Sequence, residues 1–238
     1  MNNKKRKSPR REFIGSIAAG AAALGMLSIP ESIKGAPSFF KEQPIDDADE
    51  WFKSIKGKHR MVFDATQPHE VMPFAWPKVF LLTNAATGTP PDDCGVVVVL
   101  RHTAIPYAFE DRLWAKYNFA ELFQAKDLGR AFHAADAAMA TSIRNPFWKP
   151  KSGDFKMPGF GALEIGINDL QAAGVKFCVC SAAITVYSAA VAEGMKMTPA
   201  DVMTDWLAGL LPGIQPVPSG VWALGRAQEY GCKYCFAG

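Results

Sequence analysis

The sequence lacks the short motifs that mark several large enzyme classes. It contains no H-E-x-x-H, no G-x-S-x-G and no glycine-rich phosphate-binding loop, the signatures of zinc proteases, serine hydrolases and P-loop nucleotide-binding proteins. No histidine follows the C-x-x-C near the C-terminus, so covalent c-type haem attachment through that motif is not expected. No segment after residue 29 is long and apolar enough to span a bilayer. The sequence identifies no cofactor.

A concentration of basic charge is also missing from most of the chain. Residues 1–36 hold seven Lys or Arg and two Asp or Glu, whereas the remainder holds 19 basic and 21 acidic residues. The net charge of +3 therefore comes from the N-terminal segment. Because no basic stripe is left to neutralise phosphates, we expect no nucleic-acid partner.

That N-terminal segment has the pattern of a twin-arginine leader. A basic run, Lys4–Lys7, precedes S-P-R-R-E-F-I (8–14), which departs from the pattern only in the proline between the serine and the arginine pair. The Ala/Gly-rich stretch 13–29 follows, which is short for a spanning helix. We predict a signal segment over 1–36 and export to the periplasm. Cleavage of the leader and its retention as a membrane anchor both stay open, since the residues around Ala36 make a poor cleavage site.

Alternating strand and helix patterns predict the fold of the remainder. A linker and a short helix, capped by Asp46 or Asp47, occupy 37–57, and one domain occupies 58–238. Strands are predicted at 58–65, 94–100, 175–180, 212–217 and 231–236. The run CGVVVVL (94–100) is apolar on both faces, which is typical of a central strand in a parallel sheet. We therefore predict a single three-layer α/β domain with a central, mainly parallel sheet and helical and loop insertions.

Helices are predicted between these strands. One starts at Pro106 and runs to Tyr117, and others occupy 76–86, 119–143, 162–173, 181–192, 199–209 and 220–229. Thr198 and Ser219 are predicted as N-caps, and Gly174 as the glycine that ends its helix. Residues 145–161 are rich in Pro, Gly and aromatic residues and predict a long irregular loop, a kind of segment that is often functional.

Three residues are the candidate catalytic groups. Cys180 ends one predicted strand directly before a helix, and a helix N-terminus favours the reactive thiolate form. Arg101 and His102 end the central strand, so they should lie at the same edge of the sheet, where open parallel sheets bind ligands. His102 could be a general base or a metal ligand, or simply bond to a loop. Cys178 should share a strand face with Cys180, and burial as an inert apolar residue is the alternative for Cys180.

Two further groups carry weaker signals. Cys232 and Cys235 form a C-x-x-C, typical of a redox pair or half of a metal site, but a predicted strand would point them to opposite faces. Glu110 and Asp111 are adjacent on a predicted helix, so they do not face each other and should be solvated rather than act as an acid pair.

The last two thirds of the chain resembles the DsrE/DsrF-like sulfur-relay family. Three stretches in the family's order carry the resemblance: VVVVLRH (96–102) followed by Ala104 and EDRLWAKY (110–117), LQAAGVKFCVC (170–180), and LPGIQPVPSGV (211–221) followed by Gln228 and YGCKY (230–234). The resemblance implies a compact α/β domain that assembles as a trimer or hexamer. In sulfur-carrying members a cysteine at the position matching Cys180 holds a persulfide.

The chain departs from the family by its leader, by the insertion 118–161 and by residues 187–209. Three functions follow from the residues and the resemblance together. One is an exported, homo-oligomeric binding or assembly module that holds a small ligand or metal near His102 and Cys180, with 145–161 as a lid. Another is a sulfur-handling protein, in which Cys180 is the nucleophile and Arg101 or His102 stabilises its thiolate. The last is a thiol redox protein that uses Cys232 and Cys235.

Overall fold

A computed structural model describes residues 45–132 and 143–238. The predicted leader, most of the linker and residues 133–142, near the C-terminal end of the predicted helix 119–143, lie outside the described residues. In the described part of the chain, no helix is long and apolar enough to cross a membrane.

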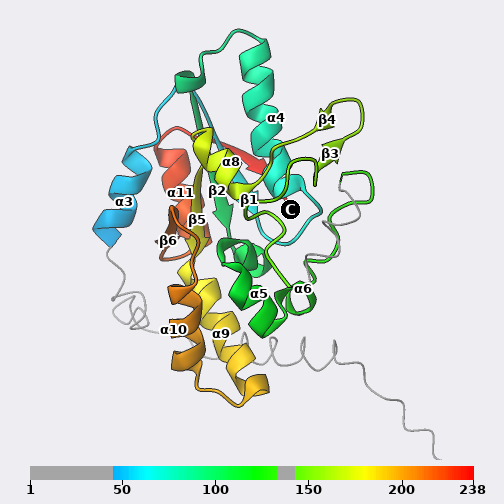
Figure 1. The fold of residues 1–238 in the computed structure, drawn as a ribbon. Coiled ribbons are helices and arrows are strands. Elements are labelled where there is room, and N and C mark those ends of the chain that lie inside the picture. The colour runs from blue at the N-terminus through cyan, green and yellow to red at the C-terminus, as the bar shows by residue number, and fades with distance from the viewer. Residues whose placement is uncertain (1–44, 133–142) are drawn as a thin grey trace, which may run out of the picture.

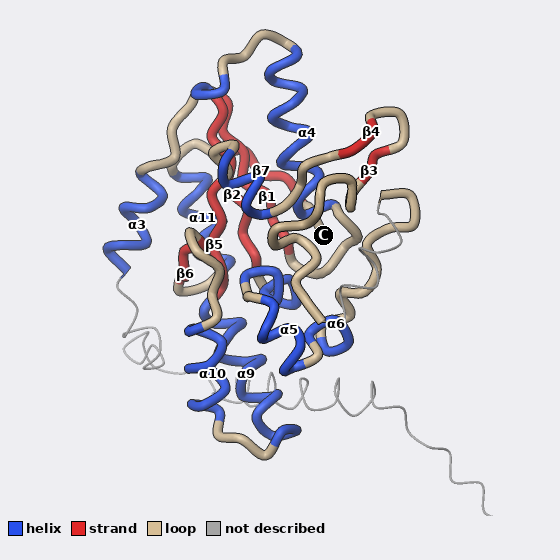
Figure 2. Tube along the Cα trace, viewed as in Figure 1, coloured by secondary structure: helices blue, strands red, loops and turns tan. Residues whose placement is uncertain are grey.

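The core of the fold is a five-stranded, all-parallel sheet, shown in red in Figure 2. Its strand order is β6-β5-β2-β1-β7. The strands are β1 (His59–Ala65), β2 (Cys94–Leu100), β5 (Lys176–Cys180), β6 (Ile214–Val217) and β7 (Lys233–Phe236). All five match predicted strands, and β2 lies in the centre, as its apolar run predicted.

Helices cover both faces of the sheet, so the predicted three-layer α/β arrangement is confirmed (Figure 1). On one face lie α3 (Ile45–Lys53) and α11 (Gly220–Glu229). On the other lie α4 (Met72–Ala86) and α8 (Ile167–Ala172). Alternate residues of β2 enter the two layers: Val97 and Val99 pack with α3 and α11, whereas Val96 and Val98 join the larger core. Because both faces are buried, β2 needs apolar residues at every position.

Most of the remaining helices lie beyond the carboxyl ends of the strands. The 3-10 helix η2 (His102–Ala108) follows β2, and α5 (Asp111–Tyr117) and α6 (Phe119–Leu122) come next in the chain. Helix α9 (Ser181–Met195) follows β5 and packs against α10 (Pro199–Ala208), and Figure 1 shows this pair below the sheet. The short 3-10 helix η1 (Pro91–Asp93) leads into β2. Residues Lys156–Met157 (β3) and Gly161–Ala162 (β4) form a small hairpin.

The predicted helix from Pro106 to Tyr117 is wrong at its start. Pro106 lies inside η2, and α5 begins only at Asp111. Between them Phe109 is extended and forms an isolated antiparallel bridge with Leu210, while the Glu110 amide donates to Gly209 O. A contact about a hundred positions along the chain therefore overrides the local helical spacing.

Other helix boundaries also differ from prediction, and α4 begins at Met72 rather than 76. Helix α8 begins at Ile167 rather than 162, because Gly161–Ala162 pairs with the strand before it in the hairpin. In the predicted helix 119–143, only α6 is helical among the described residues. Helix α3 begins at Ile45, so Asp46 and Asp47 lie in its first turn rather than at a cap.

The caps predicted at Thr198 and Ser219 are confirmed. Thr198 Oγ1 accepts from the amide of Asp201 at 3.1 Å, and Ser219 Oγ accepts from the amide of Trp222 at 3.2 Å. Each side chain satisfies an amide that the first helical turn leaves without a partner. Gly174 follows α8 with a φ of +87°, a conformation that few side chains tolerate.

Candidate functional site

The three candidate residues lie at one edge of the sheet. Strands β2 and β5 are parallel neighbours, with Leu100 paired to Val179. Arg101 and His102 therefore leave one strand next to the point where Cys180 ends the other. Strand β1, on the opposite side of β2, adds Asp64 to this edge.

Cys180 is the N-cap of α9. Its Sγ accepts from the amide of Ala183 at 3.3 Å, and the residue is 6% exposed. The positive end of a helix dipole and a donated N–H both favour a thiolate over a thiol. Next to it Ser181 is buried, and its hydroxyl makes no hydrogen bond in the described part of the chain.

The prediction that Cys178 shares a face with Cys180 is wrong. Cys178 packs in the layer of α3 and α11, whereas Cys180 packs in the larger core on the other side. The backbone leaves the strand pleat at Cys180 to start α9, which redirects its side chain. Complete burial raises the pKa of the Cys178 thiol far above its ordinary value, and the charge at Cys180 adds to this. Cys178 is therefore an inert core residue.

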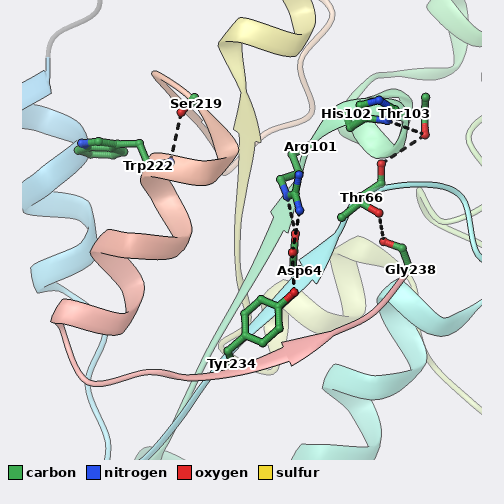
Figure 3. A network of polar contacts seen from close by, with 9 residues as sticks. All are labelled: Asp64, Thr66, Arg101, His102, Thr103, Ser219, Trp222, Tyr234 and Gly238. Atoms are coloured by element: carbon green, nitrogen blue, oxygen red, sulfur yellow. Dashed lines mark hydrogen bonds and ion pairs between the residues drawn. The ribbon is translucent and has the colours of Figure 1, made fainter.

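Arg101 is held by a buried carboxylate that the sequence did not single out. Its Nε and Nη2 donate to the two oxygens of Asp64 at 2.7 and 2.9 Å, and Tyr234 Oη donates to the same carboxylate at 2.8 Å (Figure 3). Asp64 is 1% exposed, whereas the side chain of Arg101 is 26% exposed. An acidic residue in the apolar second half of β1 was the only signal for Asp64, and Tyr234 gave none.

The charge of Arg101 interacts with this carboxylate and, more weakly, with Cys180. The hydrogen bonds to Asp64 are the main cause that raises the pKa of Arg101, and the charges of Asp64, Tyr234 and Cys180 raise it further against the opposing effect of burial. The Arg101 stem lies against Gly220, where a Cβ atom would come within 2.4 Å of Arg101 Cβ.

His102 sits in a left-handed conformation, with a φ of +50°. Its Nδ1 lies 3.3 Å from Thr103 Oγ1, which in turn contacts Thr66 O at 3.3 Å (Figure 3). Its Nε2 lies 3.3 Å from Tyr187 Oη. Partial burial lowers the pKa of His102, and the charge of Arg101 lowers it further, against a backbone hydrogen bond to Thr66. The imidazole is therefore neutral at neutral pH and able to accept a proton.

Tyr187 is a further residue of this site that sequence reasoning missed, after Asp64 and Tyr234. It is 4% exposed, and its ring makes edge contacts with His102 and Phe123 at centroid distances of 5.8 and 5.2 Å. Burial raises the pKa of Tyr187 to about 12, with a contribution from charge at Cys180. The i,i+7 relation to Cys180 was visible in the sequence, but only the fold puts His102 beside it.

The other chemical candidates lie in different surroundings. All five cysteines are free thiols, and Cys232 and Cys235 pack toward opposite faces of the sheet, as predicted. Burial raises the pKa of Cys232 to about 11 and also raises that of Cys235. Glu110 pairs with Arg112, and Asp111 accepts from the backbone of Asn145. In the part of the chain that the structure describes, no three His, Cys, Asp or Glu side chains are grouped to hold a metal ion.

The loop 145–161 does not close over this site. It walls a cavity of about 480 Å³ together with Lys78 and Leu82 of α4 and Asp169 of α8. A second cavity, of about 590 Å³, lies at the amino-terminal edge of the sheet, beside Cys94 and Lys176. Neither cavity is lined by Arg101, His102 or Cys180. The loop 145–161, predicted as a lid over these residues, therefore borders a different cavity.

No protein-family model matches the chain, and no curated protein matches it. Among solved structures it is similar to MTH1491 from Methanobacterium thermoautotrophicum, described as a protein of unknown function. The two are 16% identical with a TM-score of 0.37, over 75% of this chain and 98% of the other. A likeness at that level assigns no function, so function rests on the site itself.

Proposed function

We propose that the protein handles sulfane sulfur on Cys180. The observation that carries the proposal is the position of this thiol at the N-terminus of α9, at the same sheet edge as Arg101, which follows the neighbouring strand. Both features stabilise a thiolate, the nucleophilic form of cysteine. The resemblance of the three sequence stretches to the DsrE/DsrF-like family supports the same residue.

The reaction needs no resident cofactor. The Cys180 thiolate attacks the outer sulfur of a persulfide donor, R–S–SH. A sulfur–sulfur bond forms to Cys180, the bond to the donor's inner sulfur breaks, and R–S⁻ leaves with the electron pair. Arg101 stabilises the anion before and after transfer.

The test is sulfur loading of the full chain. Purified protein is incubated with glutathione persulfide, and its intact mass is measured before and after treatment with a reductant. We expect one added sulfur atom, mapped to Cys180 and removed by the reductant. Cys180→Ser should take up none at that position, whereas Cys94→Ser, which changes a partly exposed thiol elsewhere, should load normally. No adduct on wild-type Cys180 would refute the proposal.

A small-ligand-binding module is the second candidate, because the cavity walled by 145–161 has both charged and apolar walls. Lys78, Lys151, Glu164 and the exposed ring of Phe160 line it. A ligand screen by thermal shift tests this role, and Lys78→Ala should abolish any shift if the ligand binds there. Persistence of the shift in that variant would place the ligand elsewhere.

Location and assembly are part of the proposal. The twin-arginine pattern supports export to the periplasm, with membrane attachment only through an uncleaved leader. The family resemblance supports a homo-oligomer, a trimer or hexamer. The intact mass of protein from the exported fraction reports leader removal, and light scattering reports the assembly state. A full-length mass in the cytosolic fraction would refute export. A monomer in light scattering would refute the homo-oligomer.

A further inference from the structure

Strand β7 is an exposed edge of the sheet. Among the described residues it pairs with β1 on one side only. Lys233, Tyr234 and Phe236 are exposed and Cys235 is half-buried, whereas the other edge strand, β6, has no exposed residue. The rings of Tyr234 and Phe236 are 47% and 56% exposed. An edge of this kind is a template for pairing with a further strand.

The register fixes which backbone groups of β7 face outward. Ala237 donates its amide to Asp64 O at 2.9 Å, so residue 237 faces β1. Because alternate residues of a strand direct their N–H and C=O groups to the same side, Cys235 faces β1 as well. Tyr234 and Phe236 therefore direct theirs away from β1, and in the part of the chain that the structure describes no backbone group bonds to them. Two donors and two acceptors are left for a further strand.

The edge is complementary to a second copy of itself. When two β7 strands run antiparallel with Cys235 at the two-fold axis, Tyr234 lies opposite the partner's Phe236. Each such pair exchanges two N–H···O bonds through the outward groups. Their rings project from the same side of the sheet, where aromatic cross-strand pairs are favourable. Lys233 lies opposite the partner's Ala237, so no like charges meet across the axis.

We infer that two copies of the chain pair edge to edge through β7, in the antiparallel register centred on Cys235. The inference rests on the homo-oligomer proposed above and names its interface. A two-fold contact of this kind exists in a hexamer of two stacked rings but not in a single three-fold ring. Of the two proposed assemblies, the inference therefore selects the hexamer.

The pairing also brings a residue of the second copy to the site. Tyr234 Oη donates to Asp64 at 2.8 Å, and Asp64 accepts from Arg101 Nε at 2.7 Å (Figure 3). The partner's Phe236 covers the exposed ring of Tyr234 and excludes water from that side of the ion pair. A lower local dielectric strengthens the attraction between the carboxylate and the guanidinium.

Oxidative cross-linking of the full chain tests the register. At the two-fold axis the two Cys235 residues form a pair without hydrogen bonds, with Cα atoms about 4.5 Å apart, a separation that a disulfide spans. Diamide takes one hydrogen from each thiol, the sulfur atoms form a bond, and the reagent is reduced to its hydrazine. We expect a covalent dimer whose mapped peptides join Cys235 to Cys235. Cys235→Ser should abolish it, whereas Cys94→Ser, at another half-buried thiol, should retain it.

Light scattering tests the interface without using the thiol. Phe236→Ala removes two rings from each interface and should weaken association about a hundredfold. Phe236→Pro also removes an outward N–H while the bonds to β1 stay intact, and should prevent pairing. Both change a side chain that is exposed in the single copy, so the fold should persist by circular dichroism. Leu207→Ala, at an exposed residue of α10, should keep the wild-type mass.

The outcomes separate the interface from the assembly. A monomeric wild type would refute the homo-oligomer and the inference together. An oligomer without the Cys235 cross-link, a trimer by light scattering, or an unchanged mass in both Phe236 variants would overturn the inference alone and leave the homo-oligomer standing. Sulfur loading of Cys180 is measured separately, so its failure refutes the sulfur chemistry and not the interface.

Discussion

Gly220 offers a stringent test of the site's geometry. It is the first residue of α11, and a Cβ atom built on it would lie 2.4 Å from Arg101 Cβ and 2.7 Å from Arg101 Cδ. Arg101 Cβ is bonded to the backbone that leaves β2, so it cannot swing away as a side-chain tip could. In Gly220→Ala either α11 moves outward or Arg101 is displaced from Asp64.

The expected magnitude follows from this overlap. Forcing an extra methyl group into a packed contact costs about 1–3 kcal/mol, and alanine's better helix propensity recovers less than about 1 kcal/mol. We therefore expect Gly220→Ala to destabilise the protein by about 1–2 kcal/mol. With a urea m-value of about 2 kcal/mol/M, the unfolding midpoint should fall by about 0.5–1 M.

Gly225 in the same helix is the matched control. No atom lies within 4 Å of a Cβ built there, so Gly225→Ala should stabilise the protein by about 0.5–1 kcal/mol. The two substitutions are chemically identical and should move the midpoint in opposite directions. A Gly220→Ala protein as stable as the wild type would show that α11 does not press on Arg101, and would refute the geometry.

Three further substitutions probe other contacts. Asp64→Asn leaves the Arg101 guanidinium without its carboxylate, and should lower the free energy of unfolding by about 3 kcal/mol in urea, at the low end for a broken buried pair because Arg101 is 26% exposed. Asn145→Ala removes a fully buried amide that donates to two carbonyl oxygens, and a loss of about 3 kcal/mol should lower Tm by about 6–12 °C. Burial raises the pKa of Asp205, but hydrogen bonds from three side chains of α5 outweigh it and lower that pKa to about 2. The stability that this depressed pKa provides is present above pH 3.8 and is lost as the pH falls toward 2, so Asp205→Asn should flatten the decline in that window.

Each of these has a result that would contradict it. An Asp64→Asn protein with an unchanged midpoint would mean that the carboxylate does not hold Arg101. A Tm shift below about 2 °C in Asn145→Ala would mean that water replaces the buried amide. An acid-unfolding slope in Asp205→Asn equal to that of the wild type would assign the acid lability to other carboxylates.

Local sequence patterns were sufficient for the strands and for several helix ends. The run 94–100 is apolar throughout, and Thr198 and Ser219 precede helices that their hydroxyl groups cap. Such signals depend on residues within a few positions of one another. These residues are close in space whatever tertiary structure the chain adopts. The predicted helix start at Pro106 was wrong because Phe109 takes its extended conformation from the bridge to Leu210.

The sequence by itself determined which strands form and that Arg101, His102 and Cys180 stand at strand ends. Only the tertiary structure decided their partners. Asp64 is 37 positions from Arg101 and 170 from Tyr234, and His102 is 85 positions from Tyr187. These pairs exist because the strand order places β1 between β2 and β7, and β5 on the other side of β2. That order is set by the packing of the whole core, a property that no short segment carries.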